Sequence, residues 1–472
     1  MLFSSLVFLF YFLPVALLIY YLAPKAARNV VLLIVSLLFY MWGGTGFTLL
    51  LIASVLGNFL IAKLIERSKV HAKKWLILGI VVNVTLLFSY KYLQFFIQVF
   101  TPGPVPELTP EQQEMAKVIL PVGISFYTFH QLSMLRDIYR DRTLPKVSIV
   151  NMSLYVALFP QLVAGPIVRY KDIIYQIHSR KETIDMLYRG VQRFLIGLFK
   201  KVIIANTCAV LADNIMEQDV SSISAGAAWL GILAYTLQIY FDFSGYSDMA
   251  IGLGRLFGFN IPENFNLPYI AHSIKEFWRR WHISLSTWFR DYVYIPLGGN
   301  KKGPVRMYVN LMTVFLLTGF WHGASWSFLF WGFFHGVFLL IERLGFDKVL
   351  DKLPKLVGWA YTMLIVMIGW VFFRIEAFGD AALYVQRMFS FSAEYHRSAL
   401  YFLDYELLTV LIVALVLSTY SFRWFKEQSL MVRVTQSGVF ELAKNTVYLG
   451  LFVYCVMALT SSSYNPFIYF NF

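Results

Sequence analysis

Apolar runs long enough to cross a bilayer recur from one end of this 472-residue chain to the other, and they leave few folds open to it. A soluble enzyme would alternate such runs with polar faces, but here 58% of residues are hydrophobic, 14% are charged and the mean hydropathy is +0.62. Soluble domains average about a quarter charged residues. No polar segment is long enough to form a separate soluble domain. We therefore predict an all-α polytopic membrane protein with one integral domain over residues 1–472.

The predicted fold has about 11–12 tilted transmembrane helices plus re-entrant segments. The expected spans are 2–23, 29–42, 47–62, 75–100, 117–135, 191–212, 226–241, 307–321, 325–341, 357–373, 400–420 and 441–460. Residues 147–190 are expected to form a re-entrant hairpin, because Pro160, Gly165 and Pro166 break their apolar run and basic residues flank it. Residues 242–306 are expected to lie on the cytoplasmic side, with a piece at 247–257 that is too short to span.

Basic residues gather in the loops between apolar runs, which indicates how the chain is oriented. The clearest cytoplasmic anchor is the loop between the third and fourth runs, with Lys63, Arg67, Lys69, Lys73 and Lys74. Counting spans from it places the N-terminus and the tail 461–472 outside. Because the first run lacks a basic region and a cleavage site, we expect it to be retained as a span.

The excess of 40 Lys and Arg over 27 Asp and Glu follows this loop pattern and does not indicate a nucleic-acid partner. Cys208 and Cys455 both lie in apolar segments, so the sequence suggests neither a disulfide framework nor a cysteine metal site. A phosphate-binding glycine loop and a His-Glu-x-x-His zinc motif are also missing. We expect no metal.

His322 closes an apolar run, between Trp321 and Gly323. Histidine suits proton transfer near neutral pH, and ionisable groups at membrane depth are by default candidates for function. A structural histidine bonded to a neighbouring helix is the competing interpretation. The adjacent glycines, Gly319 and Gly323, favour function because they allow close approach of a ligand or backbone.

His282 follows a basic aromatic block that contains Trp278, Arg279, Arg280 and Trp281. Taken alone, such a block is more typical of an interfacial belt that anchors helices at lipid headgroups. It also suits a pocket for an anionic donor, with arginines on phosphates and tryptophans stacked on a ring. The paired Trp-His dipeptides strengthen the second interpretation.

Two carboxylates lie close together in the stretch 241–248, at Asp242 and Asp248. Paired acid and base catalysis would be possible there. Helix capping by Asp242 or Ser244 is the favoured interpretation.

Several long motifs resemble the membrane-bound O-acyltransferase family, in particular the members that O-acetylate alginate, peptidoglycan and other bacterial surface glycans. They are 1–5, 121–127, 158–166, 241–252, 276–300, 321–323 and 467–470, so the similarity covers essentially the whole chain. The resemblance implies a ring of tilted helices around a central tunnel. It also implies an acyl thioester donor from the cytoplasm, for which we expect acetyl-CoA, and an acceptor on the far side.

By the same resemblance His322 is the hallmark catalytic histidine and His282 occupies the second catalytic position. Arg279, Arg280, Trp281 and Trp278 are the expected donor contacts. Residues expected to line the tunnel are Trp321, Asp242, Ser244 and Gln161. The expected partners are an extracytoplasmic acetyltransferase or esterase-like protein, membrane lipids and a polysaccharide acceptor, and the expected location is the bacterial inner membrane.

The aromatic tail contains Phe467, Ile468, Tyr469 and Phe470 and ends with Phe472. An aromatic belt at the outer interface would explain it. The tail also resembles the C-terminal signature of a small protein that accompanies the teichoic-acid D-alanylation enzyme, in which the tyrosine is a proposed acyl carrier. This resemblance implies that Tyr469 accepts an acetyl group near His322.

Two other functions remain open from the sequence. One is a lipid- or protein-acylating member of the same family with a longer acyl donor. The other is a membrane transporter, although the paired broken helices of two related halves are not evident.

Overall fold

The computed structural model describes residues 1–100, 120–391, 397–419, 438–461, 464–466 and 468. In these ranges the chain is built of α-helices joined by π-helical, 3-10 and irregular segments, and the one β-bridge pairs Ile223 with Arg397. The all-helical class predicted from hydropathy is therefore confirmed. The predicted donor contacts and histidines all lie within the described ranges, whereas Tyr469 lies outside them.

Among the described residues, six helical segments are long and apolar enough to cross a membrane. They are Thr45–Arg67, Ala72–Lys91, Ile184–Met216, Trp326–Leu350, Lys355–Arg374 and Gly438–Ser461. Two shorter apolar helices, Phe8–Leu22 and Tyr405–Ser418, coincide with further expected spans. The protein is therefore a multi-pass membrane protein, and several of the other expected spans are helices buried within it.

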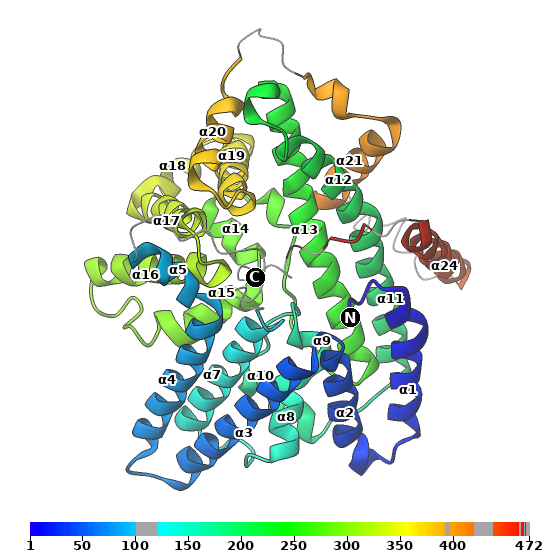
Figure 1. Cartoon of the computed structure of the whole chain (residues 1–472), viewed down its shortest axis with the longest axis vertical. Helices are drawn as coiled ribbons and strands as arrows, with labels where there is room; N and C mark the ends of the chain where they lie inside the picture. The colour runs from blue at the N-terminus through cyan, green and yellow to red at the C-terminus, as the bar shows by residue number, and fades with distance from the viewer. Residues whose placement is uncertain (101–119, 392–396, 420–437, 462–463, 467, 469–472) are drawn as a thin grey trace, which may run out of the picture.

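The N-terminal third forms one group of helices around the first hydrophobic core (Figure 1). Its elements are η1 (Phe8–Phe12), α1 (Leu13–Leu22), η2 (Lys25–Ala27), α2 (Arg28–Met41), α3 (Thr45–Arg67), α4 (Ala72–Lys91), α5 (Leu93–Phe100) and α7 (Ile124–Arg140). Short helices follow, α8 (Ile149–Ala157), α9 (Phe159–Leu162) and α10 (Tyr170–His178), separated at Leu158 and by residues 163–169, which include Gly165 and Pro166. This broken stretch is almost wholly buried, as irregular backbone at membrane depth must be.

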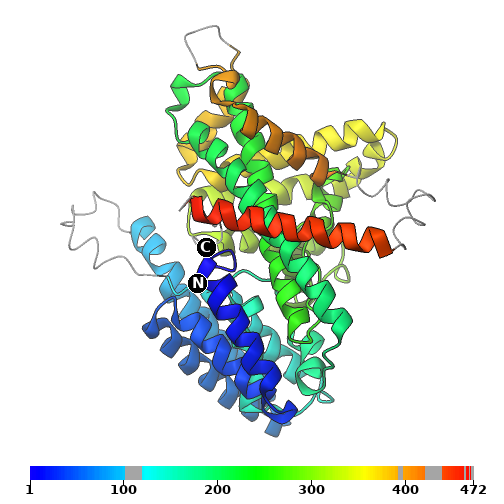
Figure 2. The same cartoon turned by 90° about the vertical axis from the view of Figure 1, so that its right-hand side faces the viewer.

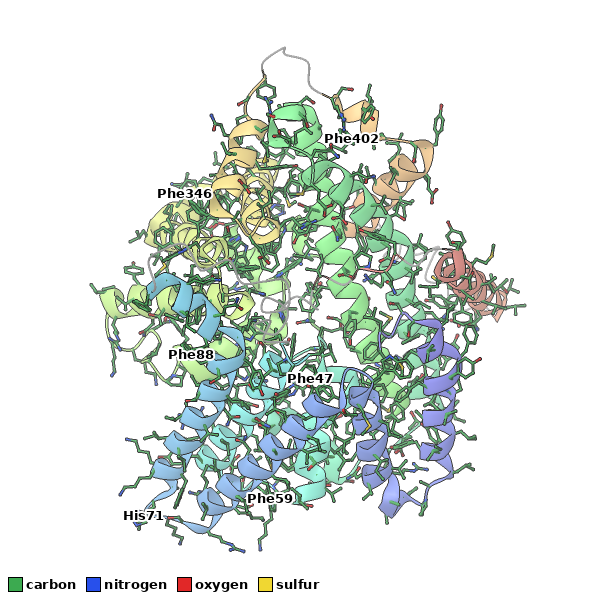
Figure 3. All side chains as sticks on the ribbon, viewed as in Figure 1. Phe47, Phe59, His71, Phe88, Phe346 and Phe402 are labelled. Atoms are coloured by element: carbon green, nitrogen blue, oxygen red, sulfur yellow. The ribbon has the colours of Figure 1, made fainter. Side chains whose placement is uncertain are left out.

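The centre and the C-terminal part contain the remaining elements. They are α11 (Ile184–Phe199), η3 (Lys200–Ala205), α12 (Asn206–Met216), η4 (Val220–Ser222), α13 (Ala225–Leu256), η5 (Pro268–Ile270), α14 (Ile274–Arg280), α15 (Ile283–Phe289), η6 (Arg290–Tyr294), α16 (Pro304–His322), α17 (Trp326–Ile341), η7 (Glu342–Phe346), α18 (Asp347–Leu350), α19 (Lys355–Arg374), α20 (Phe378–Met388), η8 (Ala399–Phe402), α21 (Tyr405–Ser418) and α24 (Gly438–Ser461). In Figure 3, His71 in the turn after α3 and Phe402 at the end of η8 lie near opposite ends of the longest axis.

Helix α13 runs through the middle of the molecule and corrects two expectations (Figure 1). The expected span 226–241 continues as one helix to Leu256, and Asp242 and Ser244 lie inside this helix instead of capping it. The helix begins where the Ser224 side chain accepts a hydrogen bond from Ala227 N–H, and it ends in a Schellman motif at Gly258 (φ +81°). The two carboxylates that suggested a helix end are compatible with burial because basic side chains of the preceding span neutralise them.

Glycines allow α11 and α13 to pack with their backbones in contact. A Cβ at Gly197 would lie 2.5 Å from the carbonyl oxygen of Gly245, and a Cβ at Gly252 would lie 2.7 Å from that of Gly190. Small residues at such crossings are the usual means by which membrane helices associate. The glycines at 245 and 252 therefore specify a helix interface.

The two hydrophobic cores meet within α13. The part of α13 up to Phe241 belongs to the second core, and the part from Phe243 onward belongs to the first. Asp242 lies at this boundary and is buried. Helix α24 is different: it packs on the outside of the bundle against α11 and is mostly exposed, as expected for a lipid-facing helix (Figure 2).

Candidate functional site

His322 is the last residue of α16 and is buried among aromatic rings. Its ring centroid lies 4.8 Å from Trp321, 5.1 Å from Trp331 of α17 and 5.0 Å from Phe373 of α19. The close crossing of α16 and α17 one turn earlier makes this possible, because a Cβ at Gly319 would lie 2.4 Å from the carbonyl oxygen of Phe328. His322, predicted to lie at membrane depth, is therefore enclosed by aromatic side chains.

His282 lies at the N-cap of α15 in a left-handed backbone conformation, with φ 43° and ψ 54°. Such a conformation is uncommon for a residue with a side chain and is found mainly where the surroundings impose it. Here Asn264 imposes it: its carbonyl oxygen accepts from Ile283 N–H at 2.9 Å, and its side-chain oxygen accepts from Ser284 N–H at 3.2 Å.

The same Asn264 side chain determines which ring nitrogen of His282 carries the proton. Its Oδ1 atom lies 3.1 Å from His282 Nδ1 and also accepts the Ser284 hydroxyl at 2.8 Å, while its Nδ2 donates to Ser247 Oγ. Because Oδ1 can only accept, a neutral His282 donates from Nδ1 and keeps a lone pair on Nε2. His282 is thus held in the tautomer in which Nε2 can accept a proton.

The structure brings the two predicted histidines together at one ring. Trp321 contacts His322 directly and lies 6.4 Å, centroid to centroid, from His282. We call His282, Trp321 and His322 the histidine cluster. It lies where the two hydrophobic cores meet, since Trp321 belongs to the first core and Trp331, against His322, belongs to the second.

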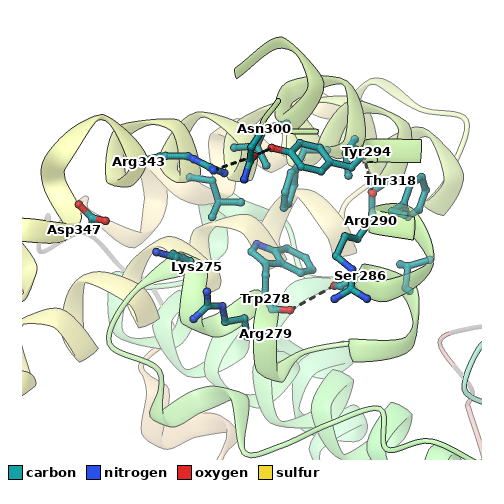
Figure 4. A pocket seen from close by; sticks show the side chains of 16 residues that line it. Lys275, Trp278, Arg279, Ser286, Arg290, Tyr294, Asn300, Thr318, Arg343 and Asp347 are labelled. Carbon is teal, nitrogen blue, oxygen red and sulfur yellow. Dashed lines mark hydrogen bonds between the residues drawn. The ribbon is translucent and has the colours of Figure 1, made fainter. Parts of the chain in front are cut away.

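A cavity of about 650 Å³ opens beside the cluster between α14, α15, α16 and η7, and we call it the basic cavity (Figure 4). Exposed cations surround its mouth: Lys275, Arg279, Arg290 and Arg343. Its interior is lined by buried rings and small polar groups: Trp278, Phe289, Phe315, Ser286 and Thr318. A charged mouth above an apolar interior suits a ligand with an anionic head and a thin uncharged arm.

The Trp331 ring separates Trp278, in the wall of the basic cavity, from His322 of the histidine cluster. Thr318, in the lining of the cavity, precedes His322 by four residues on α16, an axial rise of about 6 Å. Trp278 lies between them: its ring contacts Phe315 at 5.4 Å and Trp331 at 5.5 Å, and Trp331 contacts His322. A ligand in the cavity would therefore reach His322 if the Trp278 and Trp331 rings moved apart.

The other candidate residues occupy different surroundings. Arg280 forms an ion pair with Glu276 at 2.8 Å, and Trp281 stacks on Phe277 and packs against Trp370. Gln161 donates to the carbonyl of Tyr155 inside the broken segment, and Ser244 is buried in α13. Of the expected donor contacts, the structure thus places Arg279 and Trp278 at the basic cavity.

Trp321, expected to line the tunnel, lies at the edge of a second cavity of about 530 Å³. This cavity is almost wholly apolar and lies between α4, α7, η6 and α16. Asp242, also expected in the tunnel, contacts Ile468 of the C-terminal segment. Among the described residues, no group of three or more His, Cys, Asp or Glu side chains could hold a metal ion.

Sequence reasoning missed Lys91, which lies at the end of α4 and donates to the carbonyl oxygen of Trp321 at 2.5 Å. It also missed Asn264, Arg290 and Arg343. For Lys91 a signal existed, because a lysine inside an expected span is costly unless it has a role. For the others the sequence held no signal, since their importance comes from neighbours distant in the chain.

Comparison with known proteins identifies the family of the chain. The family model of the membrane-bound O-acyltransferases (MBOAT) matches residues 35–373. The chain is similar to the probable alginate O-acetylase AlgI of Pseudomonas putida, with 42% identity over the full length of both chains. It is also similar to the peptidoglycan O-acetyltransferase of Helicobacter pylori, with 38% identity over 80% of this chain and 77% of that protein.

A more distant similarity is to the teichoic acid D-alanyltransferase of Bacillus subtilis, with 31% identity over 55% of this chain and 67% of that protein. The matched blocks include the buried histidines and the walls of the basic cavity, since both lie within residues 35–373. The chain belongs to the membrane-bound O-acyltransferase family, and it is an O-acyltransferase of the kind found among the alginate and peptidoglycan O-acetyltransferases.

Proposed function

We propose that this enzyme takes an acetyl group from acetyl-CoA on the cytoplasmic side and delivers it across the membrane for O-acetylation of an extracytoplasmic polysaccharide. Alginate-type exopolysaccharides and other cell-surface glycans are the acceptor class that the relatives' names suggest. We place the protein in the bacterial inner membrane with both termini outside, as the basic loops indicate.

The observation that carries the proposal is the position of the basic cavity relative to His322. The cations around its mouth suit the phosphates of a nucleotide thioester, and its interior ends on α16 one turn from the histidine. Lys275, Arg279, Arg290 and Arg343 lie in the stretches that loop charges assign to the cytoplasm. Trp278 would stack on the donor or move aside to admit its acyl end.

The chemistry is acyl transfer from a thioester to a hydroxyl. His322 removes the hydroxyl proton as the oxygen attacks the thioester carbon, a C–O bond forms and the C–S bond breaks. The proton held by the imidazole then passes to the leaving thiolate, so charge and atoms balance. Before the attack, the hydroxyl would donate its one proton in a hydrogen bond to the lone pair on His282 Nε2, and it would turn to His322 as the oxygen attacks.

We further propose that Tyr469 provides the first hydroxyl and passes the acetyl group to an extracytoplasmic acetyltransferase or esterase-like partner. The phenol would be acetylated by the donor and then deacetylated by the partner's nucleophile, which regenerates Tyr469. Two residues support this proposal from the described part of the tail: Pro466 accepts from Lys201, and Ile468 donates to Asp242, whose neighbour Phe243 contacts the His282 ring.

The test measures glycan acetylation in cells that carry only the variant enzyme. We expect His322→Ala to lower acetylation by roughly 10²–10⁴-fold, the usual contribution of a general base, with normal accumulation in the membrane. Acetylation at the parent level in this variant would rule the proposal out.

A second experiment measures the KM for acetyl-CoA in isolated membranes that contain the enzyme. Replacing both Arg279 and Arg343 by Gln should raise the KM for acetyl-CoA by roughly 10-fold or more, as for the loss of charged hydrogen bonds. Arg280→Gln is the matched control, because Arg280 pairs with Glu276. Equal KM values in the double variant and the control would show that the basic cavity does not bind the donor. A preference of the enzyme for long acyl thioesters over acetyl-CoA would favour the lipid- or protein-acylating alternative.

A further inference from the structure

Each of the four described residues of the C-terminal segment makes a hydrogen bond to the body of the protein. The Tyr464 hydroxyl donates to Asp213, and the Asn465 side chain donates to Ser4 Oγ at 3.1 Å and accepts from Asn206 at 3.3 Å. The Pro466 carbonyl accepts from Lys201 Nζ, and Ile468 N–H donates to Asp242 Oδ2 at 3.0 Å. The segment therefore follows α12 and η3 and crosses to α13.

The last two of these contacts are to a buried ion pair. Lys201 Nζ lies 2.6 Å from Asp242 Oδ1, and both side chains are only 2% exposed. Ile468 packs against both hydrophobic cores, so the segment enters at the boundary where they meet. We call Lys201 and Asp242 the tail clamp.

A buried ion pair is poor evidence for stability, because removing two charges from water costs more than their attraction returns unless their other hydrogen-bonding positions are filled. Here peptide groups of the tail fill such positions, a carbonyl on the ammonium and an N–H on the carboxylate. The polarity of the pair matches the polarity of these two groups. Their matched geometry indicates recognition of the tail and gives a reason for a charge pair at this place.

The π-helical segment η3 places Lys201 on the same helix face as Asn206, which also contacts the tail. The backbone N–H of Asn206 bonds the carbonyl of Lys201, so these residues lie one above the other on the same helix face. In a regular α-helix, residues five apart would be rotated by about 140° from each other. Single π turns are frequent at functional sites, and this one aligns Lys201 and Asn206 under the tail.

The clamp is one residue away from the histidine cluster. Phe243 follows Asp242 on α13, and its ring lies 4.6 Å from the His282 ring. Ile468, held by Asp242, is followed in the sequence by Tyr469. We propose that the tail clamp is the internal receptor for the C-terminal segment and sets the position from which Tyr469 is presented to the histidine cluster. The anchoring stands by itself, whereas its use in acetyl transfer rests on the proposed function.

The experiment measures anchoring directly, by cross-linking in membranes. In a full-length Cys208→Ala/Cys455→Ala background, Ser4→Cys and Asn465→Cys introduce two thiols at positions whose side chains touch. Copper-phenanthroline oxidation and mass spectrometry then give the fraction of chains in which residue 4 is bonded to residue 465. We expect most parent molecules to cross-link.

Two double substitutions in the clamp test its polarity and its charge, and a third variant outside the clamp is the control. Lys201→Asp with Asp242→Lys keeps an ion pair but presents the wrong group to each peptide atom, and Lys201→Met with Asp242→Leu keeps the packing without charge. Both should reduce cross-linking several-fold, and size-exclusion chromatography reports whether they fold. Lys200→Met is the matched control: Lys200 pairs with Asp248 on the same two helices, and Arg193 still neutralises that carboxylate.

A change in the tail leaves the body of the protein untouched and keeps the test decisive if a clamp variant fails to fold. Ile468→Pro removes the N–H that Asp242 accepts, whereas Ile468→Ala keeps it. We expect reduced cross-linking for the proline variant alone. Parent-level cross-linking in Ile468→Pro, or in a folded clamp variant, would overturn the proposal.

Glycan acetylation in the same variants separates the anchoring from the carrier role. Clamp variants that reduce both cross-linking and acetylation would support the anchoring of the tail by the clamp and the carrier role of Tyr469. Full acetylation in Tyr469→Phe, with cross-linking still dependent on the clamp, would keep the receptor and remove Tyr469 as the carrier.

Discussion

Asn264 determines the conformation and tautomer of His282, although it lies 18 residues before His282 in the chain. Asn264 accepts hydrogen bonds from the two peptide N–H groups that follow His282 and from the Nδ1–H of its ring, which fixes both the backbone and the tautomer. An amide does this without adding a charge to a buried site. The ability of His282 to accept a hydrogen bond from an attacking hydroxyl therefore depends on a residue outside the Trp-His motif.

We predict that Asn264→Ala lowers the rate of acetyl transfer by roughly 10–100-fold, the range seen when the partner that orients a functional histidine is removed. The KM for the donor should change little, because Asn264 does not line the basic cavity. Ser247→Ala is the control, since Ser247 contacts only the amide nitrogen of Asn264. Parent-level kcat in Asn264→Ala would show that the tautomer of His282 does not matter to the reaction.

At the level of helices, the crossing of α16 and α17 decides where His322 stands. A Cβ on Gly319 would meet the Phe328 carbonyl at 2.4 Å, and a Cβ on Gly332 would meet the Phe315 carbonyl at 2.4 Å. Both glycines lie within a few residues of His322 or of Trp331, which covers it. Close contact of the two backbones thus fixes the catalytic candidate in its aromatic chamber.

Gly319→Ala should therefore destabilise the protein by about 1–3 kcal/mol through overpacking and lower acetylation as well. Gly450→Ala on α24 is the control: a Cβ there meets nothing within 4 Å, so the helix propensity of alanine should leave stability equal or slightly higher. Thermal unfolding of both variants in detergent gives the comparison. A Gly319→Ala midpoint at or above that of Gly450→Ala would mean that the crossing tolerates a wider spacing.

For the molecule as a whole, the sequence predicted well what depends on local pattern. Recurring apolar runs gave the helical membrane class, and the Trp-His dipeptides gave the pair of histidines that the structure brings to the Trp321 ring. Long motifs gave the family. These features can be predicted from the sequence because hydropathy and motif spacing are properties of residues that are close together in the chain.

Features that depend on distant partners could not be predicted. Asp242 and Asp248 suggested a helix end, because nothing beside them shows that Lys201, Lys200 and Arg193 neutralise them inside the protein. Arg279 and Arg280 look alike in the sequence, and only the structure distinguishes the one at the basic cavity from the one bound to Glu276. Charge pairing between helices thus decided the length of α13, and the orientation of α14 decided which arginine faces the basic cavity.

Asp291 is the carboxylate that ties the basic cavity to the N-terminal half of the chain. Its side chain is 12% exposed and binds Arg290, at the cavity mouth, at 2.8 Å, and Lys171 at 3.4 Å, as well as Arg169 at the start of α10. Burial alone would raise the pKa of Asp291, but the hydrogen bond from Arg290 and the charges of Arg290, Arg169 and Lys171 outweigh it and hold the pKa below its ordinary value.

A depressed pKa in the folded protein means that the unfolded chain binds the proton more readily, so Asp291 stabilises the fold fully above its unfolded pKa of about 3.9. This contribution is lost as the pH falls through the lower, folded pKa. We predict that Asp291→Asn lowers stability by about 1.5–3 kcal/mol between pH 5 and 8, as for a charged hydrogen bond. The gap to the parent should narrow below about pH 4 and close at more acid pH. Unfolding midpoints across this range provide the measurement, with Asp351→Asn, at an exposed position, as the control that shows little difference at any pH. A gap between Asp291→Asn and the parent that stays constant down to pH 3 would show that the ionised carboxylate is not what holds the two halves together.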